Sequence, residues 1–155
     1  MSEVAAGRRI RKARSTDWPA IRSLLAGSGL PVADLDATSL EHFLLETLDD
    51  GGQEKVGGAV GLERYGDIGL LRSLVVDESL RGTGCGSRLV DAVERLAVGS
   101  GLSELWLLTI DADGYFAARG YSARSRTLAP AAIRDTEEFS RLCPDSAVLM
   151  ARVLR

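Results

Sequence analysis

Residues 74–97, LVVDESLRGTGCGSRLVDAVERLA, join a short apolar run, a glycine-rich turn and an amphipathic segment without interruption. The apolar run is typical of a buried strand, and it ends at Asp77. Apolar residues after the turn recur at the three- and four-residue spacing of a helix, which Gly99 and Gly101 end. The stretch therefore predicts strand, glycine loop and helix in succession, so that several backbone N–H groups and the positive end of a helix dipole meet at the loop. Such a point binds anions, most often phosphate.

The glycine loop, residues 81–86, departs from two other phosphate-binding motifs. A Walker loop ends in Gly-Lys-Ser/Thr, whereas this loop ends in Gly86-Ser87-Arg88. The dinucleotide fingerprint opens a βαβ unit with Gly-x-Gly-x-x-Gly, whereas this loop follows a predicted hairpin. ATP or GTP hydrolysis and NAD or FAD binding are therefore disfavoured. Two alternatives stay open: the glycines either let a pyrophosphate approach the backbone or only make a tight connection.

The composition is that of one ordinary globular domain. The chain has 155 residues, 45% of them hydrophobic, with 19 Lys and Arg against 22 Asp and Glu. This acidic balance argues against nucleic acid or an anionic membrane as the main partner and favours a small molecule. Cys85, Cys143 and the single His42 are too few for a disulfide framework or a metal site. Without a signal-peptide core or an apolar run long enough to span a bilayer, the sequence predicts a cytoplasmic protein.

The order of predicted elements indicates an α/β chain of mixed α+β type, with one sheet of six or seven mostly antiparallel strands flanked by helices. Residues 1–7 are expected to form a loose tail. Strands are predicted over residues 9–14, 42–47, 55–63, 67–77, 104–110, 121–126 and 147–154. Helices are predicted from the cap at residues 16–17 to Gly27, after the glycine loop, and over residues 113–119 and 130–142. Turns are expected at residues 49–52 and 64–66.

Three loop residues, Arg81, Gly84 and Gly86, match motif A of the GNAT superfamily of N-acetyltransferases, Arg/Gln-x-x-Gly-x-Gly/Ala. The resemblance extends to residues 74–77, which resemble the family's fourth strand, and to residues 115–121, which resemble its late helix and following turn. Because it covers nearly the whole chain, it implies a GNAT fold and a single acetyltransferase domain over all 155 residues.

The resemblance implies acetyl-CoA as cosubstrate and a direct attack of a neutral amine on its thioester, helped by positioning and oxyanion stabilisation. The pantetheine arm is expected beside Leu74, Val75 and Val76. The backbone amides implied in holding the pyrophosphate belong to Arg81, Gly82, Thr83, Gly84, Cys85, Gly86 and Ser87. No protein nucleophile is required, so Cys85 is interpreted as a packing residue.

The chain departs from the family at the residue that protonates the leaving thiolate. Members commonly carry a tyrosine four residues before the glycine of the late helix, and here that position is Phe116. Tyr115 lies one residue earlier, about 100° around a helix. Either water or another group assists the thiolate, or a rotated helix lets Tyr115 act as the acid. A common asparagine is also missing, with Thr109 and Asp111 nearby, so Thr109 and Phe116 are the expected pantetheine contacts here.

The acceptor side of the site is less readable. Glu63 and Asp67 flank the predicted hairpin turn, and Glu63 is the candidate base, with water-mediated proton removal or plain surface charge as alternatives. Arg72 lies on a strand expected to be central, where a charge needs a partner. It either binds an anionic group of the acceptor or forms an internal ion pair. Asp34 and Asp36 are candidates for holding an acceptor ammonium, with capping or loop charge as the alternative.

The anion alternative for Arg72 rests on the small residues expected across the hairpin. If the turn centres on residues 65–66, Ala59 and Gly61 stand opposite Arg72 and Leu70 and leave space on the face of the arginine. A cation beside open space favours a bound carboxylate.

The sequence thus predicts an enzyme that acetylates the amine of a small amino-acid-like molecule. A non-catalytic CoA-binding or sensing module is the second hypothesis, and protein acetylation is a third. Within the superfamily, residues 30–35 and 131–147 resemble a subgroup encoded with arsenic-resistance genes. The oligomeric state stays open, with a homodimer as one alternative.

Overall fold

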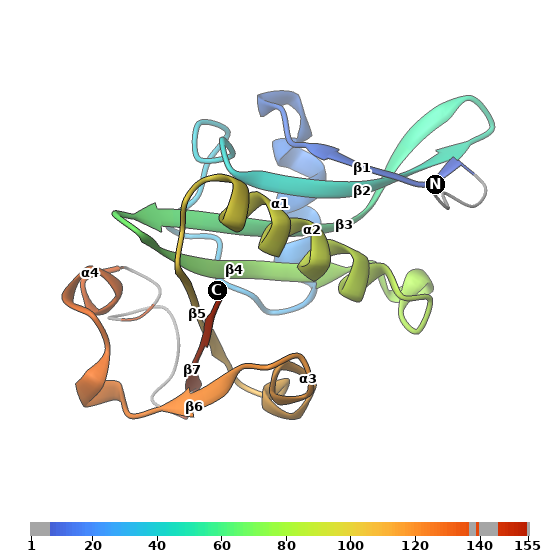
Figure 1. Cartoon of the computed structure of the whole chain (residues 1–155). Coiled ribbons are helices and arrows are strands. Elements are labelled where there is room, and N and C mark those ends of the chain that lie inside the picture. Colours follow the sequence, from blue (N-terminus) through green and yellow to red (C-terminus); the bar gives the residue numbers. More distant parts are fainter. Residues whose placement is uncertain (1–6, 137–138, 140–145, 155) are drawn as a thin grey trace. The chain divides into compact units, whose positions relative to one another are not determined.

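The fold is a mixed β-sheet flanked by helices (Figure 1). The computed structural model describes residues 7–136, 139 and 146–154. Within these residues seven strands follow the order β1-β2-β3-β4-β5-β7-β6. Their bounds are β1 Arg9–Lys12, β2 Phe43–Asp50, β3 Gln53–Tyr65, β4 Ile68–Val76, β5 Glu104–Thr109, β6 Ser122–Arg124 and β7 Val148–Val153. The pairings β1–β2, β2–β3, β5–β7 and β6–β7 are antiparallel, whereas β4 and β5 are parallel. The predicted fold class is confirmed.

The chain divides into two compact parts. The first comprises residues 1–61 and 73–93, and the second comprises residues 62–72 and 94–155. The four α-helices of the described residues are α1 Trp18–Gly27, α2 Cys85–Gly99, α3 Asp113–Ala118 and α4 Ala131–Arg134.

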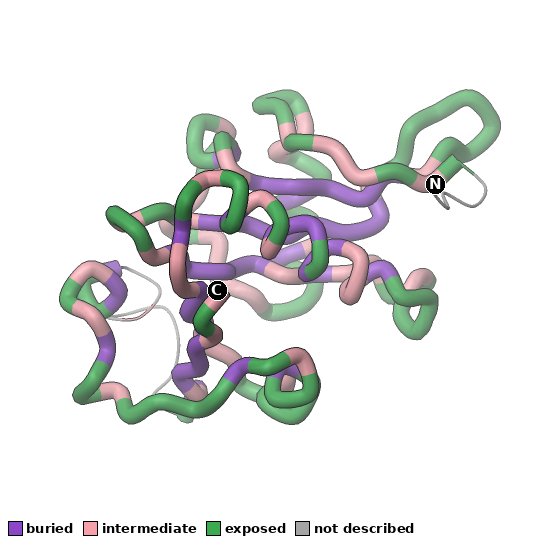
Figure 2. Tube along the Cα trace, viewed as in Figure 1, coloured by how far each residue is buried: buried purple, intermediate pink, exposed green. Residues whose placement is uncertain are grey.

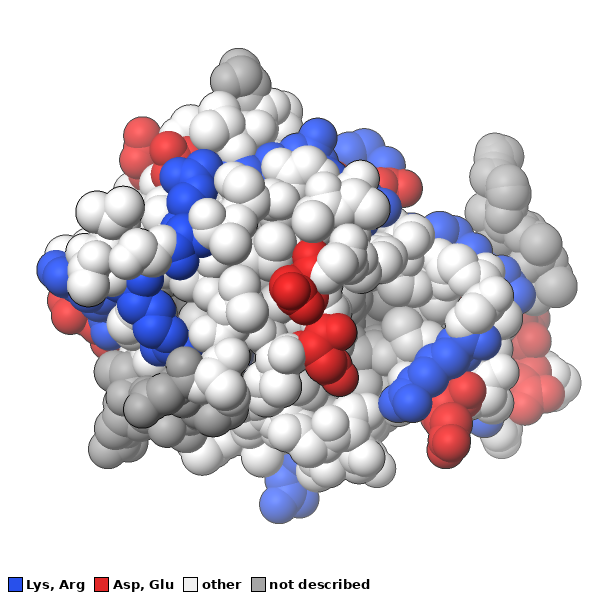
Figure 3. Space-filling view, turned by 90° about the horizontal axis from the view of Figure 1, so that it is seen from below, with Lys and Arg blue, Asp and Glu red and all other residues white. Residues whose placement is uncertain are grey.

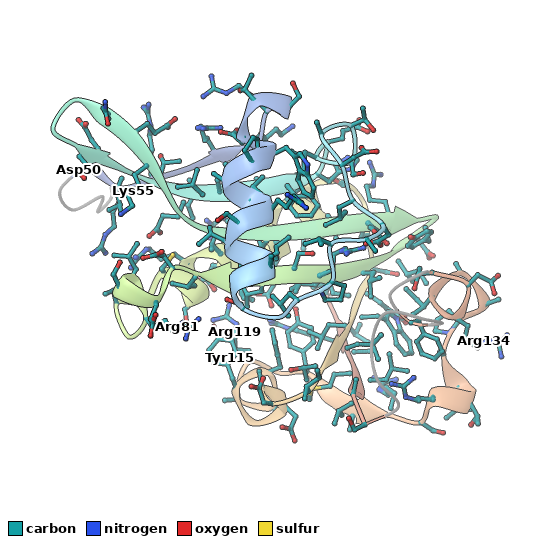
Figure 4. The ribbon with its side chains drawn as sticks, turned by 180° about the vertical axis from the view of Figure 1, so that it is seen from behind. Asp50, Lys55, Arg81, Tyr115, Arg119 and Arg134 are labelled. Carbon is teal, nitrogen blue, oxygen red and sulfur yellow. The ribbon has the colours of Figure 1, made fainter. Side chains whose placement is uncertain are left out.

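In the first part, α1 and α2 cover opposite faces of β2 and β3, as the opposite views of Figures 1 and 4 show. On the α1 side, Ile21 and Leu25 pack with Phe43 and Leu45 in one buried cluster. The alternation of β2 sends Glu46 to the other face, where it meets α2. Figure 2 shows where these strands are buried, which is from Phe43 to Thr47 at the start of β2 and in the middle of β3. The amphipathic pattern of the sequence thus predicts which face of α1 packs on the sheet.

The second part has its own hydrophobic cluster. Its buried members are Leu70, Trp106, Ala129, Ile133, Leu149 and Ala151. In the parallel register, Ile68, Gly69 and Leu70 pair with Glu104, Leu105 and Trp106, and β4 continues beyond this ladder to Val76.

The β2–β3 turn confirms the prediction of a turn at residues 49–52. Asp50 pairs with Gln53, and Gly51 and Gly52 have φ of 61° and 88°. A two-residue hairpin loop with both residues at positive φ matches the twist of the flanking strands, and glycine adopts it without steric cost.

Several predicted boundaries differ from the structure. The β3–β4 turn lies at Gly66-Asp67, because β3 extends through Tyr65, which packs against the cluster of the second part. His42 precedes β2 rather than lying in it. The helix predicted over residues 130–142 is α4 as far as Arg134, and Phe139 is again helical, while residues 137, 138 and 140–142 lie outside the described residues. Most of residues 137–145 lies outside the described residues, and so does Cys143.

Candidate functional site

The glycine loop follows β4 through one turn of 3₁₀-helix, Glu78–Leu80. The Asp77 side chain accepts from Ser79 N–H at 3.2 Å and from the Ser79 hydroxyl, and these bonds lower the Asp77 pKa. The Thr83 hydroxyl donates to the Leu80 carbonyl at 2.5 Å. Side chains at the start of the loop therefore hold it in place through local hydrogen bonds.

The exposed part of the loop turns into α2 at two glycines. Gly82 and Gly84 have φ of 80° and 88°, a region that other residues rarely adopt. Arg88 N–H donates to the Gly84 carbonyl at 3.0 Å, which starts the helical ladder. The backbone N–H groups of Cys85 and Gly86 precede this bond, at the positive end of the helix dipole. The predicted strand, glycine loop and helix are confirmed, and the arrangement suits a phosphate group.

Two further glycines, on β3, let the loop and α2 approach the sheet. A Cβ on Gly57 would stand 2.5 Å from Leu80 Cδ1, and one on Gly58 would stand 2.9 Å from Cys85 Sγ. Gly86 faces Val76, whose Cγ2 lies 3.7 Å from the position of an added Cβ. The sequence analysis missed Gly57 and Gly58, although adjacent glycines within a strand pattern indicate a close approach.

Arg81 and Cys85 differ sharply in exposure. Arg81 is exposed, and Figure 4 shows its side chain leaving the loop after β4. Its guanidinium makes two long contacts, 3.5 Å to the Val76 carbonyl and 3.5 Å to the Ser28 hydroxyl. Cys85 is 1% exposed, and burial together with the neighbouring Glu46 carboxylate raises its pKa to about 12. Such a thiol is a poor nucleophile, in agreement with the packing role.

Ser73 stands out in β4, and the sequence analysis did not single it out. It has a φ of 60° and is buried. Among the described residues it is the one non-glycine residue at positive φ. Strain of this kind costs about 1–3 kcal/mol and concentrates at functional sites. The change in backbone direction comes immediately before Leu74, Val75 and Val76.

Arg72 forms an internal ion pair. Its Nη1 lies 2.9 Å from Glu63 Oε2, and the side chain of Arg72 is fully buried while that of Glu63 is 27% exposed. The Tyr65 hydroxyl donates to Glu63 Oε1 at 2.6 Å. Of the two alternatives for Arg72, the ion pair is present in the structure, and the Glu63 carboxylate has two donors.

The space expected beside Ala59 and Gly61 is filled. In the register of β2 and β3, Phe43 pairs with Gly61, and Leu45 pairs with Ala59. The Phe43 ring comes within 2.6 Å of the position of a Cβ on Gly61. The prediction of open space is wrong because it considered the strand on one side of β3 and not β2 on the other.

Around α3, Phe116 is a core residue and Tyr115 is not. Phe116 is 4% exposed and packs edge-to-face against Tyr115 and Tyr121, whereas Tyr115 is 38% exposed. The Tyr121 hydroxyl donates to Glu94 Oε2 at 2.9 Å. Burial is the main cause that raises the Tyr121 pKa, and the charge of the Glu94 carboxylate adds to it. Thr109 accepts from Ala112 N–H at 3.0 Å and so caps the turn before α3.

In the connector after α1, Asp36 caps its own turn. It accepts from Thr38 N–H at 2.8 Å and from the hydroxyls of Thr38 and Ser39, and these bonds lower its pKa. Asp34 is half-buried. In the structure Asp36 therefore caps its turn, which was one of the two alternatives for this residue.

Two features of the described residues bear on other functions. No helix in this part of the chain has the length and apolar character to cross a membrane. Over the same residues, no three or more His, Cys, Asp or Glu side chains are grouped as metal ligands would be. On the face drawn in Figure 3, Lys and Arg lie in small groups among Asp and Glu.

Comparisons with known proteins point to one family. The model of the family described as "Acetyltransferase (GNAT) family" matches residues 9–124. An amino-acid acetyltransferase of Mycobacterium tuberculosis (strain ATCC 25618 / H37Rv) is 27% identical over 151 residues, which cover 94% of this chain and 83% of that protein.

Solved structures share the fold. N-acetylglutamate synthase from Neisseria gonorrhoeae, complexed with coenzyme A and L-arginine, matches with a TM-score of 0.81 and 24% identity over 97% of this chain and 34% of its own. This chain thus spans about a third of that enzyme. Rv2747 from Mycobacterium tuberculosis, in complex with CoA and NLQ, matches with a TM-score of 0.78 and 24% identity over 95% of this chain and 99% of its own.

Proposed function

This chain belongs to the acetyltransferase (GNAT) family, and on that basis we propose that it transfers the acetyl group of acetyl-CoA to the amine of a small amino-acid-like acceptor. The observation that carries the proposal is the exposed loop at Gly84, where amides of the first turn of α2 lie beside Arg81. The similarity to an amino-acid acetyltransferase supports the acceptor class. The finer resemblance to the arsenic-resistance subgroup extends the proposal to amino-acid-like toxins.

The loop fits the pyrophosphate of acetyl-CoA. Glycine at positions 82, 84 and 86 leaves the backbone open to a close approach, and the amides of residues 81–87 are the proposed donors. Leu74, Val75 and Val76 are proposed to lie along the pantetheine arm, with Thr109 and Phe116 as further contacts. Acetyl-CoA supplies the activated acyl group, so the protein need only position the amine, stabilise the oxyanion and manage two protons.

We place the acceptor's anionic group at Arg72. A fully buried guanidinium needs an anionic partner, and Glu63 is that partner in the structure. A carboxylate of the acceptor would exchange with Glu63 for Arg72, and the released Glu63 could take the proton of the attacking amine. In that step the C–N bond forms, the C–S bond breaks, and the thiolate takes a proton from Tyr115 or water. Asp34 and Asp36 remain proposals for contact with the acceptor ammonium.

The first prediction concerns Arg81. Arg81→Ala should raise the dissociation constant of CoA roughly 10- to 100-fold, because it removes a charge-assisted contact to phosphate. Isothermal titration calorimetry measures the effect, and Arg22→Ala, which removes an exposed arginine of α1, is the matched control with no expected change. Equal affinity in wild type and Arg81→Ala would remove Arg81 from the site.

The second prediction concerns Tyr115. If its hydroxyl protonates the leaving thiolate, Tyr115→Phe should lower kcat about tenfold or more, since general acid catalysis commonly contributes 10²–10⁴-fold. Tyr121→Phe is the control, because it removes a buried hydroxyl bound to Glu94 and should lower the melting temperature without a comparable loss of kcat. Unchanged kcat in Tyr115→Phe, with chemistry rate-limiting, excludes Tyr115 from the mechanism.

A non-catalytic CoA-binding module is the second candidate, because Phe116 is buried where relatives commonly place the acid. One experiment separates the two functions. CoA should protect either protein from thermal unfolding, but only an enzyme releases free thiol from acetyl-CoA when amines are added. The panel should contain amino acids, their phosphinic and arsenic-containing analogues, and lysine peptides to test protein acetylation. Protection without thiol release across the panel would favour the binding module.

A further inference from the structure

The cluster around Glu46 is the least expected feature of the first part of the chain. Glu46 is 1% exposed in β2, and the next residue, Thr47, is also 1% exposed. Neighbouring residues of β2 can both be buried because α1 and α2 cover opposite faces of this strand. A buried carboxylate in a strand needs a cation and hydrogen bonds to remain ionised.

Arg88 of α2 supplies both. Its Nε lies 2.7 Å from Glu46 Oε1 and its Nη2 lies 2.9 Å from Glu46 Oε2, which is a two-pronged pair. Burial alone would raise the Glu46 pKa, but hydrogen bonds from Arg88 and Cys85 outweigh it and lower that pKa. The guanidinium does not titrate in the physiological range, so the pair persists at neutral pH.

The same guanidinium also reaches the glycine loop. Arg88 Nη1 donates to the Thr83 carbonyl at 3.0 Å. In a trans peptide the carbonyl and the following N–H point in opposite directions, so this contact turns the Gly84 N–H away from Arg88. A Cβ on Gly84 would stand 3.0 Å from Nη1, so the glycine also makes room for the contact.

Below Glu46, α2 packs closely on β3. Glu46 pairs across the sheet with Gly58, where Cys85 and Leu89 of α2 pack into the space that a side chain would fill. The first turn of α2, the buried carboxylate and the loop carbonyl are thus tied together through Arg88.

We propose that Arg88, anchored by Glu46, is a positioning residue that sets the direction of the 83–84 peptide and thereby aims the Gly84 amide at the pyrophosphate of acetyl-CoA. Glu46 and Thr83 engage three of the five N–H donors of Arg88 and so fix its guanidinium in place. The proposed action is through the loop, and direct contact with the phosphate is an outcome that the test distinguishes. The inference rests on the proposed binding of acetyl-CoA at this loop.

The test compares two thioesters that share the thiol arm and differ in the pyrophosphate. S-acetylpantetheine lacks the pyrophosphate and nucleotide of acetyl-CoA. Arg88→Met should raise the KM for acetyl-CoA roughly tenfold and leave the KM for S-acetylpantetheine unchanged. Glu46→Gln should do the same, and Glu46→Gln/Arg88→Met should be no worse than either single variant, because the two residues act as one unit. Arg88→Lys should recover only part of the affinity, since an ammonium cannot make the two-pronged contact.

Controls keep the test decisive. Arg95→Met changes an exposed arginine on the same helix and should alter neither KM. If Arg88→Met fails to fold because Glu46 is left unpaired, the double variant removes that charge and carries the same expectation. Equal increases for both thioesters would show a general structural role, and an increase in Arg88→Met but not in Glu46→Gln would show direct phosphate contact. Either result overturns the proposal, as does an unchanged KM for acetyl-CoA.

Calorimetry on wild type separates this inference from the proposed function. Wild type that does not bind CoA contradicts the function itself. Wild type that binds CoA normally, with an Arg88→Met variant of equal affinity, contradicts only the role of Arg88.

Discussion

Gly84→Val should weaken CoA binding about 100-fold or more, the largest effect that we expect from a change in the loop. Gly84 has a φ of 88°, where a β-branched residue is strongly disfavoured. The new Cβ would also stand 3.0 Å from Arg88 Nη1, so the valine disturbs the contact between Arg88 and the Thr83 carbonyl. Both effects move the backbone that is proposed to hold the phosphates. Isothermal titration calorimetry of CoA measures the loss.

Gly101→Val is the matched control for backbone strain. Gly101 has a φ of 84°, and no atom lies within 4 Å of an added Cβ. It should lower the melting temperature by an amount like that of Gly84→Val while leaving the CoA affinity unchanged. Similar loss of affinity in both variants would mean that strain anywhere in the fold disturbs binding, and the assignment of the loop would fail.

The fold was predictable where local pattern and tertiary packing agree. The succession of strand, glycine loop and helix around Gly84 has both strand and helix periods and two glycine signals, and the structure follows it. The helix predicted over residues 130–142, with Pro130 near its first turn, is α4 as far as Arg134 in the part of the chain that the structure describes. The β3–β4 turn was predicted too early, at residues 64–66, because Tyr65 stands beside a glycine in the sequence, whereas in the structure it ends β3 and packs against the buried cluster of the second part.

The candidate site was predictable only in its contiguous part. Motif A contains Arg81, Gly84 and Gly86 within six residues, so the sequence alone reveals it. Glu46 and Arg88 are 42 residues apart, and neither stands in a pattern that predicts the pair. The positive φ of Ser73 could not be predicted from the sequence, because serine is not a residue that favours this backbone conformation.

The space predicted beside Ala59 and Gly61 depended on packing between neighbouring strands of the sheet. Gly61 does leave room, but the Phe43 ring of β2 occupies it. Space beside a glycine is filled when a neighbouring strand places a large side chain there. The sequence of one hairpin does not show which strand lies on its other side. The case for an anion at Arg72 therefore depends on its chemistry and not on a preformed cavity.

Arg72→Ala should raise the KM of the acceptor roughly 10- to 100-fold and leave the affinity for CoA nearly unchanged. The expected loss is that of one charge-assisted contact between the guanidinium and the acceptor's anionic group. Steady-state kinetics with the best acceptor from the thiol-release panel measures it. Arg72→Lys should recover only part of the loss, because lysine cannot present two parallel N–H donors.

Glu63→Gln distinguishes exchange at Arg72 from a static ion pair. The Glu63 carboxylate lies 2.9 Å from Arg72 Nη1 and would compete with the proposed anionic group of the acceptor for the guanidinium. Glutamine keeps the size and an acceptor oxygen but loses the charge, so under exchange the KM should stay level or fall, while kcat falls if Glu63 takes the amine proton. If the Arg72–Glu63 ion pair is static, Arg72→Ala and Glu63→Gln should both lower the melting temperature. The KM of the acceptor should then stay at the wild-type value in both variants. That outcome would remove Arg72 from the acceptor site and leave it as a structural partner of Glu63.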